Sequence, residues 1–359
     1  TLQNQPAGSA IYNRAGGVES ANTFFQVAYM TKEERINLLH KLNEYYTDSV
    51  ISEKYKNCNT RVMLTNAEDN INNRFNQLIR YGFYEDLEKI GKTETALGIQ
   101  VGQGFGRNFE FTIDIERERG NNLLVMGKDE KKAMSIFEFS AMSLLYDELF
   151  INNDASSTLL YIADMSEMEE LRDDICSLVY LQEILPDQIS VVKIKQLERL
   201  IDTIYRKVVE RKESRTMDKQ PVFFMIFGID RAKNITINRM YDDEEQSIST
   251  IDKLLSIFKY GPEVGIHSIV WGENPLFVKR ILGERYVGFF DLRVAFGLSA
   301  EDMYDIASEG NIGNMNDSTA AYINVASDIK NKHFRPYTIP AKVWLDDFAD
   351  VYMETIEEE

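Results

Sequence analysis

The sequence predicts an α/β fold in which a mostly parallel β-sheet carries helices on both faces. From about residue 96 onward, short apolar runs alternate with long segments of helical periodicity, the pattern of strands joined by crossover helices. The run Val222–Phe227 is apolar at every position, as expected of a parallel strand buried on both faces. Ligands bind beyond the carboxyl ends of such strands, so functional side chains are expected there.

The elements are predicted in order along the chain. Thr31 is expected to cap a first helix, because Glu34 completes a capping box three residues later. The predicted helices share apolar positions at helical spacing, and they are 31–46, 71–84, 131–150, 165–184, 194–210, 247–259, 276–282 and 300–307. The predicted strands share short apolar runs, and they are 24–29, 96–101, 109–113, 122–127, 158–163, 222–227, 267–271, 292–296 and 320–325.

Two details of these strands matter later. The strand 24–29 has no evident hairpin partner before it. Gly102, Gly104 and Gly106 lie between the strands 96–101 and 109–113, where a hairpin turn is a better interpretation than a nucleotide-binding loop because no helix follows directly.

Four segments are predicted from these patterns. Residues 1–30 form the tail of an earlier domain, and residues 31–84 form a small helical linker. The main domain covers residues 85–345, and residues 346–359 form an acidic C-terminal tail, of which 356–359 are expected to be solvated.

The composition predicts a globular protein with a substantial core, because hydrophobic residues make up 44% and charged residues 27% of the chain. No apolar run approaches the roughly eighteen residues of a membrane span, and the first residues lack the features of a signal peptide. The missing initial Met predicts a piece cut from a longer chain. Two cysteines without CxxC spacing predict neither a disulfide framework nor a zinc site. These features favour a cytoplasmic location and are compatible with membrane association of the full-length protein.

The net charge of -18 bears on the partners. A surface that grips DNA needs clustered Lys and Arg side chains that displace counterions. DNA binding by this fragment alone is therefore disfavoured, and protein partners are favoured.

The first candidate site follows the strand 122–127, where a phosphate-binding loop would lie. The working pattern is G-x-x-x-x-G-K-[ST], and the chain reads GKDEKKAM from Gly127. Lys132 replaces the second glycine, Ala133 the lysine, and Met134 the hydroxyl that binds Mg²⁺. The pattern therefore predicts a strand-to-helix turn with solvated charges rather than a working loop.

Charge supports the same interpretation of this turn. Asp129 and Glu130 put negative charge where phosphates would lie, and they are expected to cap the helix N-terminus themselves. What remains of a degenerate phosphate loop is Gly127, Lys128, Lys131 and Lys132. Weak binding of ATP with Mg²⁺ through these lysines is the alternative to binding no cofactor, and no metal site is predicted.

The second candidate site follows the strand 222–227. An active motor needs an acid for Mg²⁺ and a residue that positions water near the end of this strand. Gly228 and Ile229 occupy those positions. Asp230 comes one residue later, and it is either a catalytic acid or the start of a turn or short helix.

Several segments resemble motifs of the FtsK/SpoIIIE-type ATPases. GPEVGIH at 261–267 is similar to a GxxxGIH segment, and DLRVAFGLSAED at 291–302 to a late RIAFxVSSxxDS segment. The helix from Arg206 to Arg211 is similar to the long arginine-bearing helix of the family. HFRPY at 333–337 resembles its closing strand. The resemblance covers about residues 85–340, and its specificity lies in the order of the motifs.

The start of the chain also resembles this family. PAGSAIY at 6–12 and FQVA at 25–28 are similar to the PGRA…FQVA ending of a preceding module. The chain therefore looks like the last of several tandem modules, as in the EssC/EccC motors of type VII secretion. The resemblance implies a P-loop NTPase-like (RecA-like) sheet, with residues 1–30 as the tail of a preceding ATPase module and 85–345 as a degenerate ATPase domain.

The chain departs from the family at the positions that handle nucleotide. GENP at 272–275 stands where active members have a Thr-Gln-Arg-Pro sequence that senses nucleotide. With the changes at Gly127–Met134 and at Gly228 and Ile229, three strand ends have lost their motif residues. This predicts that the ancestral ATPase is inactive in this fragment.

Three functions are compatible with these observations. The first is a non-hydrolysing module that docks a partner or substrate and regulates an active module of the same chain. The second is an ATP-driven DNA translocase module in which Lys132 and Asp230 replace the missing residues. The third is a docking module for type VII secretion substrates. The resemblance implies other motor modules and a protein substrate as partners, and either a monomer or a homo-oligomer of the full-length protein.

Two residues that suggest chemistry are expected to be structural. His267 opens a buried strand and is expected to pack in the core rather than act as a base. Trp271 ends the same strand, and core packing is the better interpretation than an aromatic face for adenine.

Overall fold

The computed structural model describes the chain in segments, and the chain divides into two compact units, residues 1–61 and 62–359. The described residues are 8–13, 22–28, 30–31, 33–38, 40–41, 97–104, 110–152, 160–166, 178–214, 220–235, 248–307, 318–327 and 332–357. The last of these ranges includes residues 338–341, which join the last strand to the last helix. The predicted linker helix 71–84 lies outside these residues.

The first unit contains a β-hairpin of β1 (Ser9–Asn13) and β2 (Asn22–Gln26), paired antiparallel. The predicted strand 24–29 is thus wrong in its bounds and in its lack of a partner. The capping box is confirmed: Glu34 N donates to Thr31 Oγ1 at 3.2 Å, and Thr31 N donates to Glu34 Oε2 at 2.9 Å. Residues 33–38 and 40–41 are helical.

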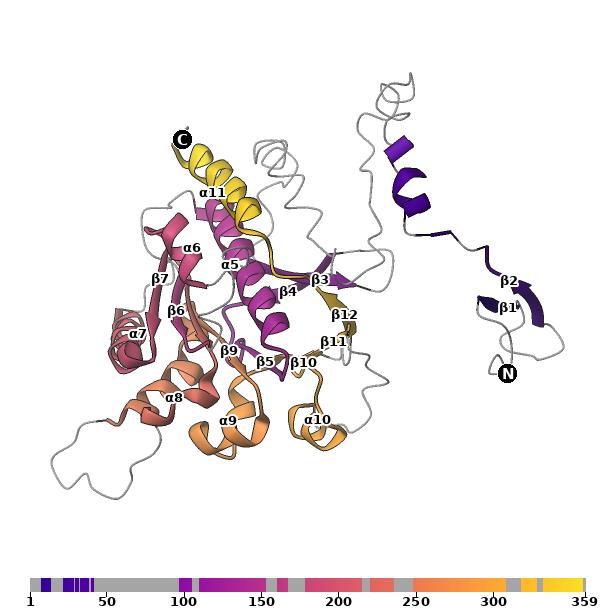
Figure 1. Cartoon of the computed structure of the whole chain (residues 1–359). Coiled ribbons are helices and arrows are strands. Elements are labelled where there is room, and N and C mark those ends of the chain that lie inside the picture. Colours follow the sequence, from indigo (N-terminus) through magenta and orange to yellow (C-terminus); the bar gives the residue numbers. More distant parts are fainter. Residues whose placement is uncertain are drawn as a thin grey trace. The chain divides into compact units, whose positions relative to one another are not determined.

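The second unit contains a ten-stranded sheet among its described residues, in the order β4-β3-β12-β11-β10-β5-β9-β8-β6-β7 (Figure 1). The strands are β3 (Leu97–Gly104), β4 (Glu110–Ile115), β5 (Leu123–Gly127), β6 (Leu160–Asp164), β7 (Ile189–Lys193), β8 (Val222–Phe227), β9 (Ile266–Gly272), β10 (Leu292–Phe296), β11 (Ala320–Asn324) and β12 (Lys332–Pro336). The run from β10 to β7 is parallel throughout, and β11, β12, β3 and β4 continue it antiparallel. The predicted mostly parallel α/β sheet is confirmed.

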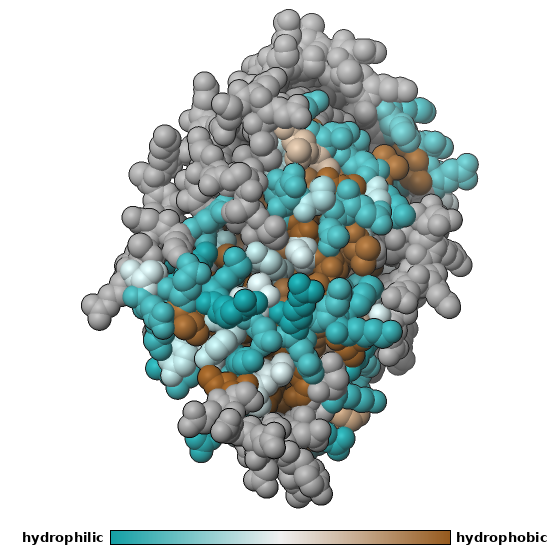
Figure 2. All heavy atoms as spheres, turned by 90° about the vertical axis from the view of Figure 1, so that its left-hand side faces the viewer, coloured by the Kyte–Doolittle hydropathy of each residue, from teal (hydrophilic) through white to brown (hydrophobic). Residues whose placement is uncertain are grey.

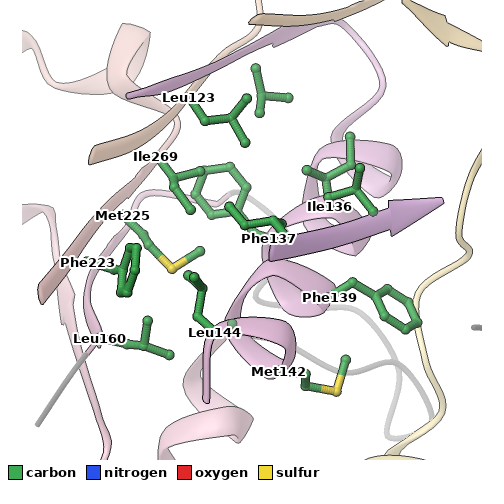
Figure 3. Close-up of a cluster of buried hydrophobic side chains, with 14 of the residues drawn as sticks. Leu123, Ile136, Phe137, Phe139, Met142, Leu144, Leu160, Phe223, Met225 and Ile269 are labelled. Carbon is green, nitrogen blue, oxygen red and sulfur yellow. The ribbon is translucent and has the colours of Figure 1, made fainter. Parts of the chain in front are cut away.

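Helices cover both faces of the sheet, as predicted. The described helices are α5 (Glu130–Asn152), α6 (Leu178–Ile184), α7 (Leu197–Ser214), α8 (Thr250–Tyr260), α9 (Pro275–Leu282), α10 (Ala300–Ala307) and α11 (Lys342–Glu357). One hydrophobic core joins α5, α6 and α11 to one face, and a second joins α7, α8, α9 and α10 to the other. Figure 3 shows the first core, with Phe137 of α5 near Leu123 and Ile269 of the sheet.

The two cores follow from the alternation of side chains along a strand. In β5, Leu123 and Val125 belong to the core under α5, whereas Leu124 and Met126 belong to the core on the other face. Because both faces are covered, every residue of this strand is buried. This is why the central strands were recognisable as uninterrupted apolar runs.

Several predicted elements need correction. β7 was not predicted, because its short ISVVK sequence has an alternating polar residue and forms an edge of the sheet. The predicted start of a helix at Met165 is wrong: Met165 N donates to Phe227 O at 3.0 Å and continues the β6 ladder. Gly102 and Gly104 belong to β3 rather than to a turn. A Cβ at Gly102 would lie 2.3 Å from Arg335 O, so the close β12 backbone requires glycine.

The predicted acidic tail 346–359 is wrong over most of its length. Residues Lys342–Glu357 form α11, and Leu345, Phe348 and Tyr352 are fully buried in the first core. Their spacing of three and four residues is that of one helix face. Tyr180 Oη donates to Asp346, which joins α11 to α6. Because carboxylates surround these apolar residues in the sequence, their helical spacing was not recognised and the helix was not predicted.

None of the helices in the part of the chain that the structure describes is long and apolar enough to cross a membrane.

His267 lies at the amino end of β9 and packs in the core, as predicted. It is 2% exposed, and its ring stacks on Phe223 with centroids 5.8 Å apart. Its Nδ1 lies 2.9 Å from Asn121 O, which fixes the neutral tautomer that donates from Nδ1. Burial, together with the nearby Arg117 and Arg211 guanidinium groups, lowers the pKa of His267 to about 4.

This pKa predicts acid destabilisation. An unfolded histidine has a pKa of about 6.5. Between about pH 6.5 and pH 4, the unfolded chain therefore binds a proton at this imidazole, whereas the folded chain does not. The stabilisation is complete above pH 6.5 and is lost as the pH falls toward 4, by about 2 kcal/mol at pH 5. Denaturant unfolding of the wild type and of His267→Gln at pH 7 and pH 5 measures this. The decrease in the free energy of unfolding from pH 7 to pH 5 should be about 2 kcal/mol smaller in the variant than in the wild type. Equal decreases in the two proteins would contradict the prediction.

Candidate functional site

The candidate site lies at the carboxyl ends of β5 and β9, which are neighbours in the sheet. The chain leaves β5 through α5 on one face and leaves β9 through α9 on the other. Adjacent parallel strands whose connections go to opposite faces form a topological switch point, where ligands bind in α/β sheets. The structure thus places the first candidate, Gly127–Met134, where the sequence predicted a site.

The end of β5 is closely packed. Trp271 at the end of β9 is fully buried, and its Nε1–H donates to Gly127 O at 3.1 Å. Its ring centroid lies 4.3 Å from that of Phe227 at the end of β8. A Cβ at Gly127 would lie 2.3 Å from the ring of Phe296. Core packing of Trp271 is therefore confirmed, and aromatic rings fill the space around the first residue of the loop.

The N-terminus of α5 is capped by the chain itself. Lys132 N donates to Asp129 Oδ1 at 3.2 Å, an N-cap hydrogen bond. The Lys132 ammonium lies 2.9 Å from Asp129 Oδ2. The predicted capping role of Asp129 is confirmed. Ala133 and Met134 are buried in the core, where they present no polar atom to the loop. Lys128 and Lys131 are exposed.

Glu130 does not extend into solvent, which corrects the expectation of a turn with solvated charges. Its carboxylate accepts two hydrogen bonds from Arg231, Nη1 to Oε1 at 3.0 Å and Nη2 to Oε2 at 3.1 Å. This is the bidentate geometry that makes arginine–carboxylate pairs strong. The two side chains are 17% and 20% exposed, so water screens the pair only in part.

Arg231 also contacts the ends of β6 and β9. Its Nη1 donates to Met165 O at 3.0 Å, just after β6. Its Nη2 lies 3.8 Å from Glu273 Oε2, just after β9. The guanidinium carbon lies 5.2 Å from the ring centroid of Trp271, within cation–π range. One side chain thus connects the start of α5 with the loops that follow three strands.

Asp230 lies at the same edge. Ile229–Arg231 form a short 3-10 helix, so this residue starts a helical turn, one of the two roles considered. Its Oδ1 accepts a hydrogen bond from Glu273 N at 3.3 Å. Burial raises the pKa of the Asp230 carboxyl, partly opposed by that hydrogen bond and by Arg231. The structure thus brings Asp230 and the α5 N-terminus together through Arg231 and Glu130.

A second ion pair at this edge, between Asp164 and Lys193, was not predicted from the sequence. Asp164 ends β6 with a side chain that is fully buried, and its Oδ2 lies 3.0 Å from Lys193 Nζ at the end of β7. Its Oδ1 accepts from Ser166 N at 2.9 Å. The predicted strand 158–163 ended one residue too early, and β7 was not predicted, so neither charge was placed. Recognition of ISVVK as a strand would have brought the pair to this edge.

The charges define what this edge can bind. Lys132, Lys193 and Arg231 are each held by a carboxylate of the same chain, Asp129, Asp164 and Glu130 respectively. A phosphate group would have to displace these carboxylates and would meet the repulsion of those that remained.

Comparison with known proteins gives matches among solved structures. No protein-family model and no curated protein matches the chain. EssC (ATPases 2 and 3) from Geobacillus thermodenitrificans aligns with a TM-score of 0.50 at 11% identity, over 74% of this chain and 50% of that one. The cytoplasmic domain of the Thermomonospora curvata type VII secretion ATPase EccC aligns with a TM-score of 0.50 at 10% identity, over 71% and 30%.

A third match is the pCW3 conjugation coupling protein TcpA, with a TM-score of 0.49 at 13% identity, over 74% and 71% of the two chains. The chain thus spans half of the EssC structure and less than a third of the EccC structure. The prediction made from the motif order is confirmed for the fold: this chain has the P-loop ATPase fold of the EssC and EccC modules, the fold that its FtsK/SpoIIIE-type motifs implied.

Proposed function

We propose that this chain is a non-hydrolysing module of an FtsK/SpoIIIE-type translocase motor, which docks a partner or substrate and regulates an active module of the same chain. The observation that supports this most is the Arg231–Glu130 pair at the N-terminus of α5. A P-loop holds phosphates at this position, whereas here a carboxylate occupies it and the nearby arginine is already bound. On this proposal, neither nucleotide nor Mg²⁺ is needed to hold the edge together.

The hairpin β1–β2 supports docking to another module. Phe24 and Phe25 are consecutive in β2, so they point to opposite faces of the hairpin. They are 59% and 48% exposed. A two-stranded hairpin is marginally stable on its own, and exposed apolar side chains on both faces favour a place beside the sheet of a neighbouring module. This agrees with the proposal that residues 1–30 are the tail of a preceding ATPase module.

Protein secretion is the setting that we favour over DNA handling. One of the two structures with a TM-score of 0.50 is a type VII secretion ATPase. The net charge of -18 also disfavours a DNA substrate for this module. The substrate would then be a protein, met in the cytoplasm.

Nucleotide binding tests the proposal. Fluorescent ATP with Mg²⁺ is expected to show no saturable binding to the full chain, and phosphate release is expected to stay at background, because phosphates would have to displace Asp129 and Glu130. Lys132→Ala and Asp230→Ala should leave both results unchanged, as should Lys332→Ala, a control at an exposed position at the start of β12.

Two outcomes would overturn the proposal. Saturable Mg²⁺-dependent binding with turnover would show an active site. If DNA stimulated that turnover and Lys132→Ala or Asp230→Ala abolished it, the alternative of an ATP-driven DNA translocase module with a non-standard site would replace the present one.

A further inference from the structure

A second group of charged side chains lies at the amino edge of the parallel sheet, opposite the candidate site. It comes from the turn between β4 and β5 and from the C-terminal ends of α7 and α8, which precede β8 and β9. Arg119 lies on the turn, Lys212 in the last turn of α7 and Lys259 in the last turn of α8. Figure 2 looks onto the side where α7 and α8 lie, and its surface is mainly hydrophilic.

Two of these cations, Lys212 and Lys259, lie close to one aromatic ring, that of Tyr260. Lys212 Nζ lies 3.9 Å and Lys259 Nζ 4.9 Å from its centroid. The pKa of the Tyr260 hydroxyl is lowered, first by a hydrogen bond with Lys259 and by its charge, then by the charges of Lys212 and Arg119. We call Arg119, Lys212, Lys259 and Tyr260 the cationic cluster.

The cationic cluster lacks the internal carboxylates found at the other edge. Among the described residues, no carboxylate lies within ion-pair distance of Lys212, Lys259 or Arg119. At the carboxyl edge, by contrast, Lys132, Lys193 and Arg231 each have one.

Other charged groups lie in the same region. Arg117 lowers the pKa values of Arg211 and His267, and Arg211 itself donates to three backbone carbonyl oxygens. Burial and then the charge of Arg117 hold the pKa of Arg211 below its usual range, partly opposed by Glu210, and Glu116 and Glu118 flank Arg117 in the sequence. Glu213 follows Lys212 in the sequence and Glu263 lies just after Tyr260, so the cluster is distinguished by its lack of ion-pair contacts among the described residues rather than by an excess of positive charge.

Helix dipoles account for part of this arrangement. A lysine in the last turn of a helix is favourable by about 0.3–1 kcal/mol, which suits Lys212 and Lys259 separately. The dipoles do not explain why two helix ends bring two like charges to one ring. Like charges at such separations repel, and an anionic partner would relieve that repulsion.

We propose that the cationic cluster binds an acidic segment of a protein partner. Lys212 and Arg119 are exposed and Lys259 is half-buried, and they come from three different elements, so an extended chain with several carboxylates could contact more than one of them at once. Nucleic acid is the less suitable partner, because its dense phosphate charge would extend beyond the cluster onto a protein of net charge -18.

The turn that carries Arg119 is well formed. Glu118 N donates to Glu116 O at 2.8 Å and Asn121 N to Glu118 O at 3.1 Å, and Asn121 Oδ1 accepts from Glu116 N at 3.1 Å. Tyr260 is likewise fixed at the end of α8. The cluster therefore presents its charges from ordered backbone, which reduces the entropy lost on binding.

The binding of labelled poly-glutamate peptide to the full chain tests this, measured by fluorescence anisotropy at low and at physiological salt. Lys212→Glu/Lys259→Glu is expected to weaken binding by at least about tenfold, since each exposed pair contributes up to about 1 kcal/mol. Lys212→Gln/Lys259→Gln, which removes the charges without adding new ones, should have a smaller effect in the same direction. Lys195→Glu is the control and should have little effect.

The same titration with a labelled oligothymidine of equal charge separates the two classes of partner. Tighter binding of the oligonucleotide, lost in the same variants, would replace the acidic peptide with nucleic acid. No binding of the peptide even at low salt, or equal binding by all variants, would overturn the proposal. Because the cluster lies at the opposite edge from Glu130 and Arg231, these results are independent of the outcome of the nucleotide assays.

Discussion

Replacing Arg231 with glutamine is expected to lower the free energy of unfolding by about 3 kcal/mol. The guanidinium is 17% exposed and holds Glu130 through two hydrogen bonds, with a third to Met165 O. Without it, Glu130 is left partly buried without its bidentate partner, and a loss of this kind costs more than the pair contributes when intact. Denaturant unfolding of the two proteins at neutral pH measures the difference.

A double-mutant cycle separates the pair from its surroundings. Glu130→Gln should cost less than Arg231→Gln, because arginine can still bind Met165 O and Glu273. The double variant should cost less than the sum of the two, with a coupling of about 1–3 kcal/mol. Arg199→Gln, at an exposed position of α7, is the control and should change stability by less than about 0.5 kcal/mol. If the losses in the free energy of unfolding from the two substitutions were additive, the proposed interaction between Arg231 and Glu130 would be contradicted.

If the module binds no nucleotide, as proposed, Arg231 would hold the loops at this edge together in its place. In a nucleotide-binding P-loop fold, phosphates and Mg²⁺ neutralise and connect the loops that follow the strands. Here one guanidinium connects the start of α5 with Met165 and Glu273 and stacks near Trp271. Hydrogen exchange of the amides in these loops should therefore increase together in Arg231→Gln, whereas ATP should not slow exchange in the wild type.

The central strands could be predicted from the sequence because burial on both faces removes polar residues from them. Val222–Phe227 and Leu292–Phe296 have the predicted bounds for this reason. The edge strand β7 lacks that pattern and was missed. In α11 the periodic Leu345, Phe348 and Tyr352 were present but lay among carboxylates. In elements with one solvated face, the hydrophobic pattern of the sequence is weaker. Their structure then depends on contacts with residues that are distant in the sequence.

The position of the candidate site in the chain could be predicted from the sequence, but the ion pair that connects its side chains could not. The loop after β5 and the capping by Asp129 follow from local sequence. The Arg231–Glu130 pair joins residues 101 positions apart, and their approach depends on the order of strands in the sheet. No local pattern distinguishes Arg231 from a solvated arginine. The charges that define the site were therefore visible only once the topology was known.

Replacing Arg293 with methionine is expected to lower the free energy of unfolding by about 3–5 kcal/mol. Arg293 is the arginine of the DLRVAF segment in β10 and is 5% exposed. Its Nε donates to Phe290 O at 2.7 Å, its Nη1 to Ile306 O at 2.5 Å, and its Nη2 to Val287 O at 3.0 Å. Methionine keeps much of the apolar stem but leaves these carbonyls without their donor, and each such loss costs about 1–3 kcal/mol when buried.

These contacts give the motif arginine a structural role. Ile306 lies in the last turn of α10 and Val287 in the short helix before β10, so the guanidinium binds carbonyl groups at two helix ends, where positive charge is also favoured by the dipole. Urea unfolding of Arg293→Met measures the cost, and Arg285→Met, at an exposed position just before the same short helix, is the matched control with an expected change below about 0.5 kcal/mol. A loss as small as that of the control would show that water replaces the guanidinium. A loss of the expected size would mean that the fold itself requires this arginine of the motif.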